Sequence, residues 1–350
     1  MESSTTPIMH TAEPADDSGE TAFYVNVAIG TIGLMGNAFV CLVMLRYHNV
    51  FNSSTNKLII HQSVVDCLSS VMFLMRRFLV VSPPAVVPGN IIGSLYCNLW
   101  WSEWVQYGML LTSTYNLVAI STERYFATCQ SVKHRNVFST RRLKLIMASA
   151  WICGWVSEFH NLVLAYQVDG ACDVSWPTAT VQAIWGVFIF VKDLVIPIGI
   201  IIFAYSKIIS ELHHRSKARV GDNNQDARNM LSKANKNVTK TLFLVAVCFV
   251  ICWTPAEINY ILYNLGLNNN FVNSTMYQAL NAFVVVNVCV NPFIYCFTYE
   301  RFQKQVKKMI CGGARGNQVG TTDDGSTMRN NTVQSTVSGP APSGTGNINA

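Results

Sequence analysis

The sequence predicts an all-α integral membrane protein: a bundle of seven transmembrane helices followed by a short amphipathic helix. Half of the 350 residues are hydrophobic and only 13% are charged, against about 25% charged in an ordinary soluble domain. The charges cluster between long apolar runs, each of which reaches the roughly 20 residues that a helix needs to cross about 30 Å of hydrocarbon. The seven runs lie near residues 23–46, 56–82, 98–125, 144–166, 181–209, 238–265 and 276–298.

The distribution of lysine and arginine predicts which helix ends face the cytoplasm. Of the 25 such residues, only Arg76, Arg77 and Lys192 fall toward one end of the helices, and the other 22 fall at the opposite end. Cytoplasmic ends carry the excess of basic residues, so we expect a multi-pass plasma-membrane protein with segment 1–22 extracellular and the C-terminus cytoplasmic. Because the basic residues flank membrane spans, we expect them to attract anionic lipid rather than nucleic acid.

This topology sorts the eleven cysteines. Only Cys97 and Cys172 fall on the extracellular side, where a disulfide persists. We therefore predict a bridge between the top of the third helix and the loop after the fourth.

The chain after the seventh run divides into two parts. Residues 299–310 place apolar side chains on one face, which predicts a helix lying on the membrane surface, with Cys311 after it as a palmitoylation site. This helix closes a receptor domain of residues 23–311. The tail, 312–350, is rich in Gly, Ser, Thr and Asn, so we expect it to be disordered and to offer phosphorylation sites.

Short motifs stand at fixed places within the predicted helices. They are Gly36–Asn37 in the first, Asp66 in the second, Glu123–Arg124–Tyr125 ending the third, Trp151 in the fourth, Pro197 and Tyr205 in the fifth, Phe249 to Pro255 with Trp253 in the sixth, and Asn291 to Tyr295 with Pro292 ending the seventh. Together with Gly93-x-x-x-Cys97, this ordered set resembles the rhodopsin-like (class A) G-protein-coupled receptors. The closest resemblance in character is to neuropeptide receptors.

The resemblance implies a receptor, not an enzyme, that activates heterotrimeric G proteins. In the family, the pair formed here by Glu123 and Arg124 is locked in the inactive state. On activation in the family, the arginine leaves this pair and contacts the G protein together with Tyr205 and Tyr295. Phe249 packs below the ligand site. Arrestin and receptor kinases are expected partners through the Ser/Thr-rich tail.

Asp66 is a carboxylate within an apolar helix, which costs about 2.5–3.5 kcal/mol unless it has partners. Ser113, Asn287 and Asn291 are the matching polar positions of the third and seventh helices. In the family, such a cluster binds a sodium ion that favours the inactive state, and we expect no other cofactor. The alternative is a water-filled polar cluster with structural value only.

The outer half of the predicted bundle carries charges of both signs, and ionisable residues in a membrane span are functional candidates. The seventh helix has Val285 where light receptors hold retinal on a lysine, and the third has Gln106 where amine receptors carry an aspartate. A peptide is therefore the expected ligand, supported by the signal for a two-residue hairpin turn at residues 168–171. We expect one ligand cavity above Trp253, lined by Arg76, Arg77, Gln106, Lys192, Asp193 and Glu257 and closed by Tyr277 and Asn281 of the seventh helix. Glu103 and Trp253 are further expected ligand-binding residues.

Three alternatives stand beside this interpretation. In the first, the ligand is a non-peptide small molecule. In the second, the outer charges only pair with each other, for instance Arg77 with Glu103, and do not contact the ligand. In the third, the chain is a membrane transporter. A transporter leaves Glu123–Arg124–Tyr125 unexplained and predicts repeats that the sequence lacks. The chain also departs from the family: Asn235 and Thr114 weaken contacts expected to hold the resting state. Cys97 lies 27 residues before Arg124 instead of 25, which predicts an irregular outer third helix.

Overall fold

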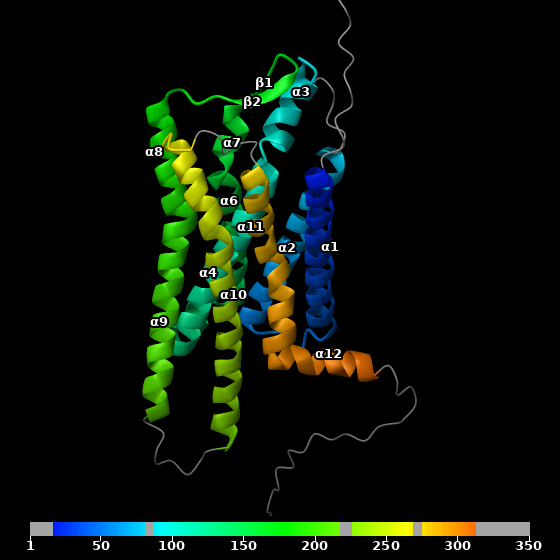
Figure 1. The fold of residues 1–350 in the computed structure, drawn as a ribbon. Helices are drawn as coiled ribbons and strands as arrows, with labels where there is room; N and C mark the ends of the chain where they lie inside the picture. Colours follow the sequence, from blue (N-terminus) through cyan, green and yellow to red (C-terminus); the bar gives the residue numbers. More distant parts are fainter. Residues whose placement is uncertain (1–16, 81–86, 218–225, 269–274, 313–350) are drawn as a thin grey trace, which may run out of the picture.

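The computed structural model of the protein describes residues 17–80, 87–217, 226–268 and 275–312. The long helices lie side by side, with a β-hairpin over one end of the bundle and α12 across the other (Figure 1). We call these the hairpin end and the α12 end. Residues 1–16 and 313–350, which hold most of the N-terminal segment and of the tail, lie outside the described residues.

The helical prediction is confirmed. Within the described residues, the longest helices are α1 (Asp17–Arg46), α2 (Ser54–Val80), α4 (Trp104–Cys129), α6 (Thr140–Ser157), α9 (Ile196–Lys217), α10 (Asp226–Asn264) and α11 (Thr275–Thr298). Shorter elements connect or extend them: α3 (Ile91–Leu95), η1 (Tyr96–Trp101), α5 (Ser131–Val137), α7 (Phe159–Leu164), β1 (Ala165–Val168), β2 (Ala171–Val174), α8 (Ala179–Phe190), η2 (Val191–Val195) and α12 (Glu300–Gly312).

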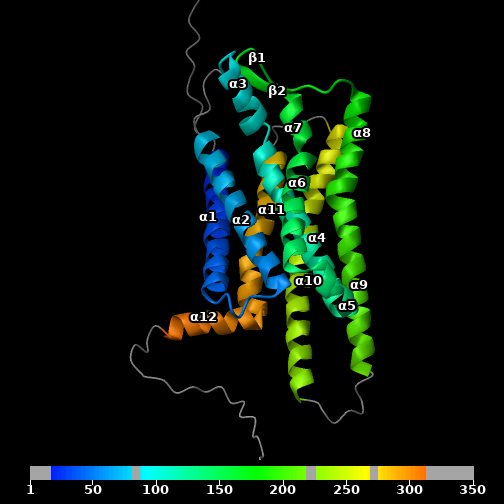
Figure 2. The same ribbon diagram turned by 180° about the vertical axis from the view of Figure 1, so that it is seen from behind.

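Among the described residues, five of the predicted spans are long and apolar enough, by length and composition, to cross a membrane. These are Glu20–Arg46, Ser54–Phe78, Ala179–Arg215, Lys236–Asn264 and Met276–Thr298. The remaining two, α4 and α6, stand within the same bundle (Figure 2). α4 buries polar side chains such as Asn116 and Glu123 against its neighbours. α6 begins with basic residues and ends after 18 residues, so the predicted run 144–166 is interrupted.

The helices extend into the polar segment that separates the predicted runs 181–209 and 238–265. α9 continues to Lys217 and α10 begins at Asp226, so only residues 218–225 between them lie outside the described part. α10 extends well beyond the apolar run because polar, basic residues are good helix formers once a helix is established.

The segment before α4 is irregular, as the long spacing from Cys97 to Arg124 predicted. α3 leads into η1, a π-helix, and Glu103 then has a left-handed backbone (φ 62°) before α4 begins. A π turn holds one residue more than an α turn, so additional residues fit without displacing Arg124 from the α12 end. Cys97 of η1 forms the predicted disulfide with Cys172, and their Cα atoms are 5.4 Å apart.

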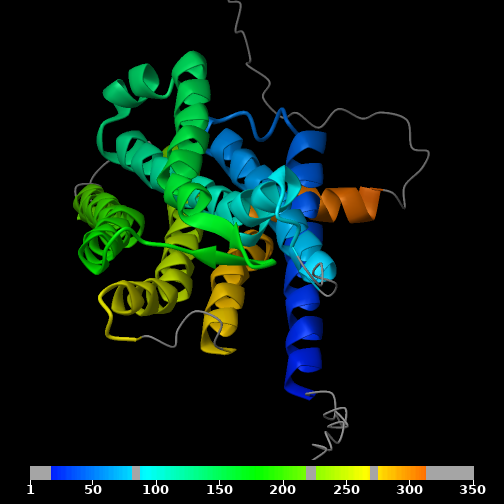
Figure 3. The same cartoon turned by 90° about the horizontal axis from the view of Figure 1, so that it is seen from above.

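The two-residue hairpin is also confirmed. Val168 pairs with Ala171 across a turn in which Asp169 and Gly170 both have positive φ, 49° and 81°. Positive φ at both central residues is the geometry of a type I′ turn. The disulfide joins β2 to η1, and the amide of Val87 donates to Gly170 O at 2.8 Å. The hairpin is therefore fixed across its end of the bundle, as the view from above shows (Figure 3).

α12 runs across the end of the bundle that is opposite the hairpin (Figure 1). Its Phe302 is fully buried, and Val306 and Met309 pack against the same core. Ile310, expected on the same apolar face, is 68% exposed. Cys311 is exposed beside it, so the end of α12 presents both residues away from the core.

Candidate functional site

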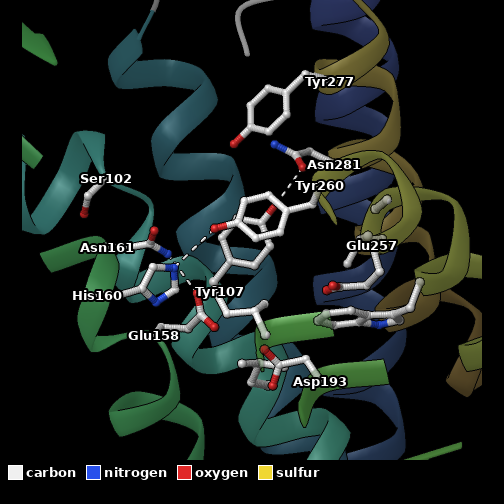
Figure 4. A pocket seen from close by; sticks show the side chains of 15 residues that line it. Ser102, Tyr107, Glu158, His160, Asn161, Asp193, Glu257, Tyr260, Tyr277 and Asn281 are labelled. Carbon is white, nitrogen blue, oxygen red and sulfur yellow. Dashed lines mark hydrogen bonds between the residues drawn. The ribbon is translucent and has the colours of Figure 1, made fainter. Parts of the chain in front are cut away.

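A cavity lies at the hairpin end of the bundle, and Trp253 is one of its lining residues; Figure 4 shows the side chains around it. Its walls come from α4, the junction of α6 and α7, α8, η2, α10 and α11, with Ser102 contributed by the turn before α4. Leu111, Ile189, Trp253, Ala256 and Val284 supply its apolar surface. The other ten lining residues are polar: Ser102, Tyr107, Glu158, His160, Asn161, Asp193, Glu257, Tyr260, Tyr277 and Asn281.

Departures from regular helix place several of these side chains. Asp193 belongs to η2, and π turns of this kind recur at functional sites. Glu158 stands at the break between α6 and α7, which brings His160 and Asn161 of α7 to the wall. The side-chain amide of Asn161 donates to Glu158 Oε2 at 2.8 Å.

Hydrogen bonds between aromatic and polar side chains connect the walls. The hydroxyl of Tyr107 on α4 donates to Asn281 Oδ1 on α11 at 2.6 Å. The imidazole Nε2 of His160 lies 3.4 Å from the hydroxyl of Tyr260 on α10. Figure 4 shows both contacts, which cross the cavity from α4 to α11 and from α7 to α10.

Glu158, Asp193 and Glu257 form a part of the lining that we call the deep wall, where acidic side chains outnumber basic ones. Lys192 Nζ donates to Asp193 at 2.6 and 2.8 Å, bonds Ser157 Oγ, and lies 3.9 Å from Glu158 Oε1. Glu257 is more than nine-tenths buried, and its Oε2 has no hydrogen-bond partner among the described residues.

A second polar group surrounds Asp66 in the middle of the bundle. Ser113 Oγ donates to Asp66 Oδ1 at 2.7 Å, and Asn291 Nδ2 donates to Oδ2 at 2.9 Å. Gln62, which the sequence did not single out, lies 3.4 Å from Oδ1 and also bonds Ser113. Asn287 makes no bond to Asp66 among the described contacts. The amide oxygens of Asn287 and Asn291 are buried and have no hydrogen-bond partner within the part of the chain that the structure describes. Carboxylate, hydroxyl and amide oxygens of this kind fit a small hard cation.

A third group forms at the α12 end around Glu123, which is fully buried. Arg124 donates to both carboxylate oxygens at 2.7 and 2.9 Å. His134 Nε2 lies 2.7 Å from Oε1, and the hydroxyls of Ser54 and Thr55 donate at 2.7 and 2.9 Å. The carboxylate is thus fixed by α2, α4 and α5 together.

Buried aromatic residues link the cavity to this end. Phe249 packs against Trp253, with ring centroids 5.8 Å apart. Tyr205 and Tyr295 are buried nearer the α12 end, and the Tyr295 hydroxyl has no hydrogen-bond partner among the described residues.

Residues 36–295 match the sequence model of the family described as "7 transmembrane receptor (rhodopsin family)". The chain belongs to this family. The matched segment begins at Gly36 and ends at Tyr295, so it contains the motifs from the first helix to the seventh. The protein is therefore a multi-pass membrane receptor that signals through G proteins.

The receptor brings half of the predicted ligand-binding residues to its cavity. Asp193, Trp253, Glu257, Tyr277 and Asn281 line it. The other five, Arg76, Arg77, Glu103, Gln106 and Lys192, lie outside the lining. The structure therefore does not bring all ten predicted ligand-binding residues together in the lining of this cavity.

Four of these five side chains have contacts elsewhere in the bundle. Gln106 turns toward α2 and donates to Ser69 Oγ at 3.1 Å. Arg76, and not Arg77, forms the ion pair with Glu103, with a distance of 2.7 Å. The guanidinium of Arg77 lies over the ring of Phe73, 4.8 Å from its centroid.

Sequence reasoning also missed lining residues of the receptor. Tyr260 is seven residues after Trp253 and three after Glu257, so helical periodicity places all three on one face. Tyr107, His160 and Asn161 carried no comparable signal, because their positions depend on the irregular start of α4 and on the break after α6.

The departures at Thr114 and Asn235 have different outcomes. Thr114 is buried, and its hydroxyl donates to Leu110 O of its own helix at 3.2 Å. Asn235 belongs to α10, but its side chain lies outside the described residues. Two residues later, Asn237 Nδ2 donates to Thr298 O at 2.7 Å, and Asn237 Oδ1 accepts from the amide of Glu300 at 3.0 Å. α10 is therefore tied to the start of α12.

Proposed function

We propose that this receptor lies in the plasma membrane with its hairpin end outside, binds an extracellular peptide in the cavity, and activates a heterotrimeric G protein at its α12 end. The observation that carries the peptide assignment is the lining of the cavity. Ten of its fifteen lining residues are polar or charged and come from several helices. A peptide offers several spaced polar groups to such a surface.

Charge and cysteine placement support this orientation. Basic residues gather at the α12 end, among them Arg46 in the last turn of α1, Arg135 in α5 and Arg301 in α12. Cytoplasmic surfaces carry such an excess. The disulfide lies at the other end, where an extracellular environment permits oxidation.

The position of the hairpin supports a peptide over a smaller ligand. β1 and β2 lie over one end of the bundle (Figure 1), and the disulfide joins β2 to η1. A fixed strand pair offers backbone groups to an extended ligand that reaches out of the cavity. A fatty acid needs a pocket with a single charged group, whereas this lining carries three carboxylates together with several hydroxyl and amide groups.

Events at the α12 end depend on the Glu123 group. A bound ligand that favours release of Arg124 from Glu123 would present the guanidinium, with Tyr205 and Tyr295, to the G protein. Arrestin and receptor kinases would then act on the Ser/Thr-rich tail. The exposed Cys311 ends a helix that lies across the bundle, which supports palmitoylation as a second membrane anchor.

The Asp66 group supports a sodium ion as an allosteric ligand. Asp66 and Ser113 would hold the ion, and the buried amide oxygens of Asn287 and Asn291, which have no hydrogen-bond partner among the described residues, would supply further ligands. An ion that binds the resting arrangement better than the active one lowers the population of the active state.

A paired screen tests the proposed function. Cells that express the receptor or its Arg124→Ala variant are exposed to a library of short peptides, with cytosolic calcium and cAMP as readouts. We expect some peptides to give a response in the first cells and none in the second at equal surface expression. Activation by lipids or monoamines alone would refute the peptide assignment, and equal responses in both cells would refute the coupling mechanism.

A further inference from the structure

We propose that the deep wall of the cavity is a subsite for a positively charged group of the ligand, with Glu257 as its anchor. This inference deepens the proposed function and rests on the cavity being the ligand site. It names the chemistry that the ligand must carry, which the peptide assignment alone leaves open.

The balance of charge at the cavity is the first observation. Glu158, Asp193 and Glu257 all line it, whereas no lysine or arginine among the described residues does. The nearest ammonium is that of Lys192, behind the wall. Three carboxylates and one ammonium leave the site short of positive charge, and buried ionised groups are costly unless they are paired.

The way in which this ammonium is shared singles out Glu257. Lys192 bonds Asp193 directly and lies 3.9 Å from Glu158. Asp193 also accepts a bond of 3.2 Å from Tyr115, and Glu158 accepts from Asn161. These two acids therefore have partners within the protein.

Glu257 lacks such partners. It is 8% exposed, and its buried Oε2 has no hydrogen-bond partner among the described residues. Figure 4 shows its carboxylate among the cavity side chains, and Asp193 and Trp253 line the same cavity. A cation that enters the cavity would supply both the missing charge and the missing donor.

Aromatic neighbours favour a planar cation. Trp253 and Tyr260 lie one turn to either side of Glu257 on α10, and Tyr107 lines the cavity opposite. Aromatic faces attract cations, and a guanidinium or amidinium adds bidentate hydrogen bonds to a carboxylate. An arginine side chain of a peptide combines these features.

The location differs from the position where amine receptors carry their aspartate. That position is Gln106, which is bonded to Ser69 and turned away from the cavity. The acidic anchor, Glu257, is instead on α10, and Asp193 of η2 and Glu158 at the end of α6 line the same cavity.

The experiment uses a matched pair of small probes, benzamidine and its neutral analogue benzamide. Thermal unfolding of the purified full-length receptor in detergent is measured at increasing concentrations of each. We expect benzamidine to stabilise the wild type with a half-saturating concentration at least about tenfold below that of benzamide, a difference of about 1.4 kcal/mol. In Glu257→Gln this difference should disappear.

Asp173→Asn is the matched control. Asp173 is an exposed carboxylate of β2 at the same end of the receptor, outside the cavity lining. The Asp173→Asn substitution removes one negative charge, as Glu257→Gln does, and this variant should retain the preference for benzamidine. An equal loss in both variants would indicate only a general field, and would overturn the subsite.

Two further outcomes decide the inference. Equal stabilisation of the wild type by both probes, or by neither up to about 10 mM, overturns it. If Glu257→Gln shows no cooperative unfolding, Glu257→Asp replaces it, and unchanged affinity for benzamidine in that variant also overturns the inference. Because unfolding involves no G protein, failure here is separate from failure of signalling in the peptide screen. Activation of cells by benzamidine alone would support the subsite while refuting the need for a peptide.

Discussion

Arg76 and Glu103 form an ion pair with an N–O distance of 2.7 Å, and this pair ties α2 to the residue before α4. Glu103 has a left-handed backbone, which is uncommon for a residue other than glycine. Arg76 also donates to the backbone oxygen of Trp100 in η1. The guanidinium therefore holds the irregular segment against α2 at two points.

The pair should be visible as energetic coupling. Arg76→Met and Glu103→Gln are each expected to lower the stability of the receptor by about 1–2 kcal/mol, because both side chains are mostly buried. The double variant should lose little more than either one. Thermal unfolding in detergent measures the three values. Arg77→Met is the control, since Arg77 contacts Phe73 instead; its loss should add to that of Glu103→Gln.

The disulfide should act as a unit in the same way. Cys97→Ala and Cys172→Ala are each expected to reduce surface expression, because opening the bridge costs about 2–5 kcal/mol in small extracellular frameworks. The double variant should express like the single ones, as measured by antibody binding to intact cells. Cys153→Ala, at an exposed free cysteine, should express normally. Additive losses in the double variant would contradict a shared bond.

Sodium should stabilise the receptor through Asp66. Replacing choline by sodium at constant ionic strength is expected to raise the unfolding temperature of the wild type, since a ligand that binds only the folded state stabilises it by mass action. In Asp66→Asn the rise should vanish, because the amide carries no charge. Gln303→Asn, far from this cluster at the α12 end, should keep the response. The same rise with sodium in Asp66→Asn would exclude the proposed ion site.

Arg124 should be needed for signalling and not for folding. Arg124→Ala is expected to abolish or strongly reduce nucleotide exchange on the G protein, because it removes the guanidinium that leaves Glu123 for the partner. Surface expression should remain close to wild type. Lys133→Ala, a nearby change at an exposed basic residue of α5, controls for loss of charge. Normal nucleotide exchange in purified Arg124→Ala would refute the mechanism.

Local signals in the sequence were enough to predict the membrane spans, the hairpin turn and the disulfide. Apolar runs of sufficient length define spans because a single segment in lipid can satisfy its backbone N–H and C=O groups only by forming a helix. Asp169–Gly170 defined the hairpin turn because both residues tolerate positive φ. Cys97 and Cys172 were paired from topology alone, since no other cysteine was expected outside. Each of these inferences needs only neighbours in the chain or the side of the membrane.

The cavity could not be deduced in that way. A face assigned by counting residues assumes a regular helix, and each additional residue in a π turn rotates the rest of the helix by about 100°. The π-helix η1 and the left-handed backbone of Glu103 therefore leave Gln106 outside the lining. The break at Glu158 brings His160 into it. The spans, the bridge and the family follow from the order of residues along the chain. The sharing of Lys192 between Asp193 and Glu158, and the absence of a hydrogen-bond partner for Glu257 Oε2 among the described residues, follow from tertiary packing. Such pairing depends on three helices meeting at one point.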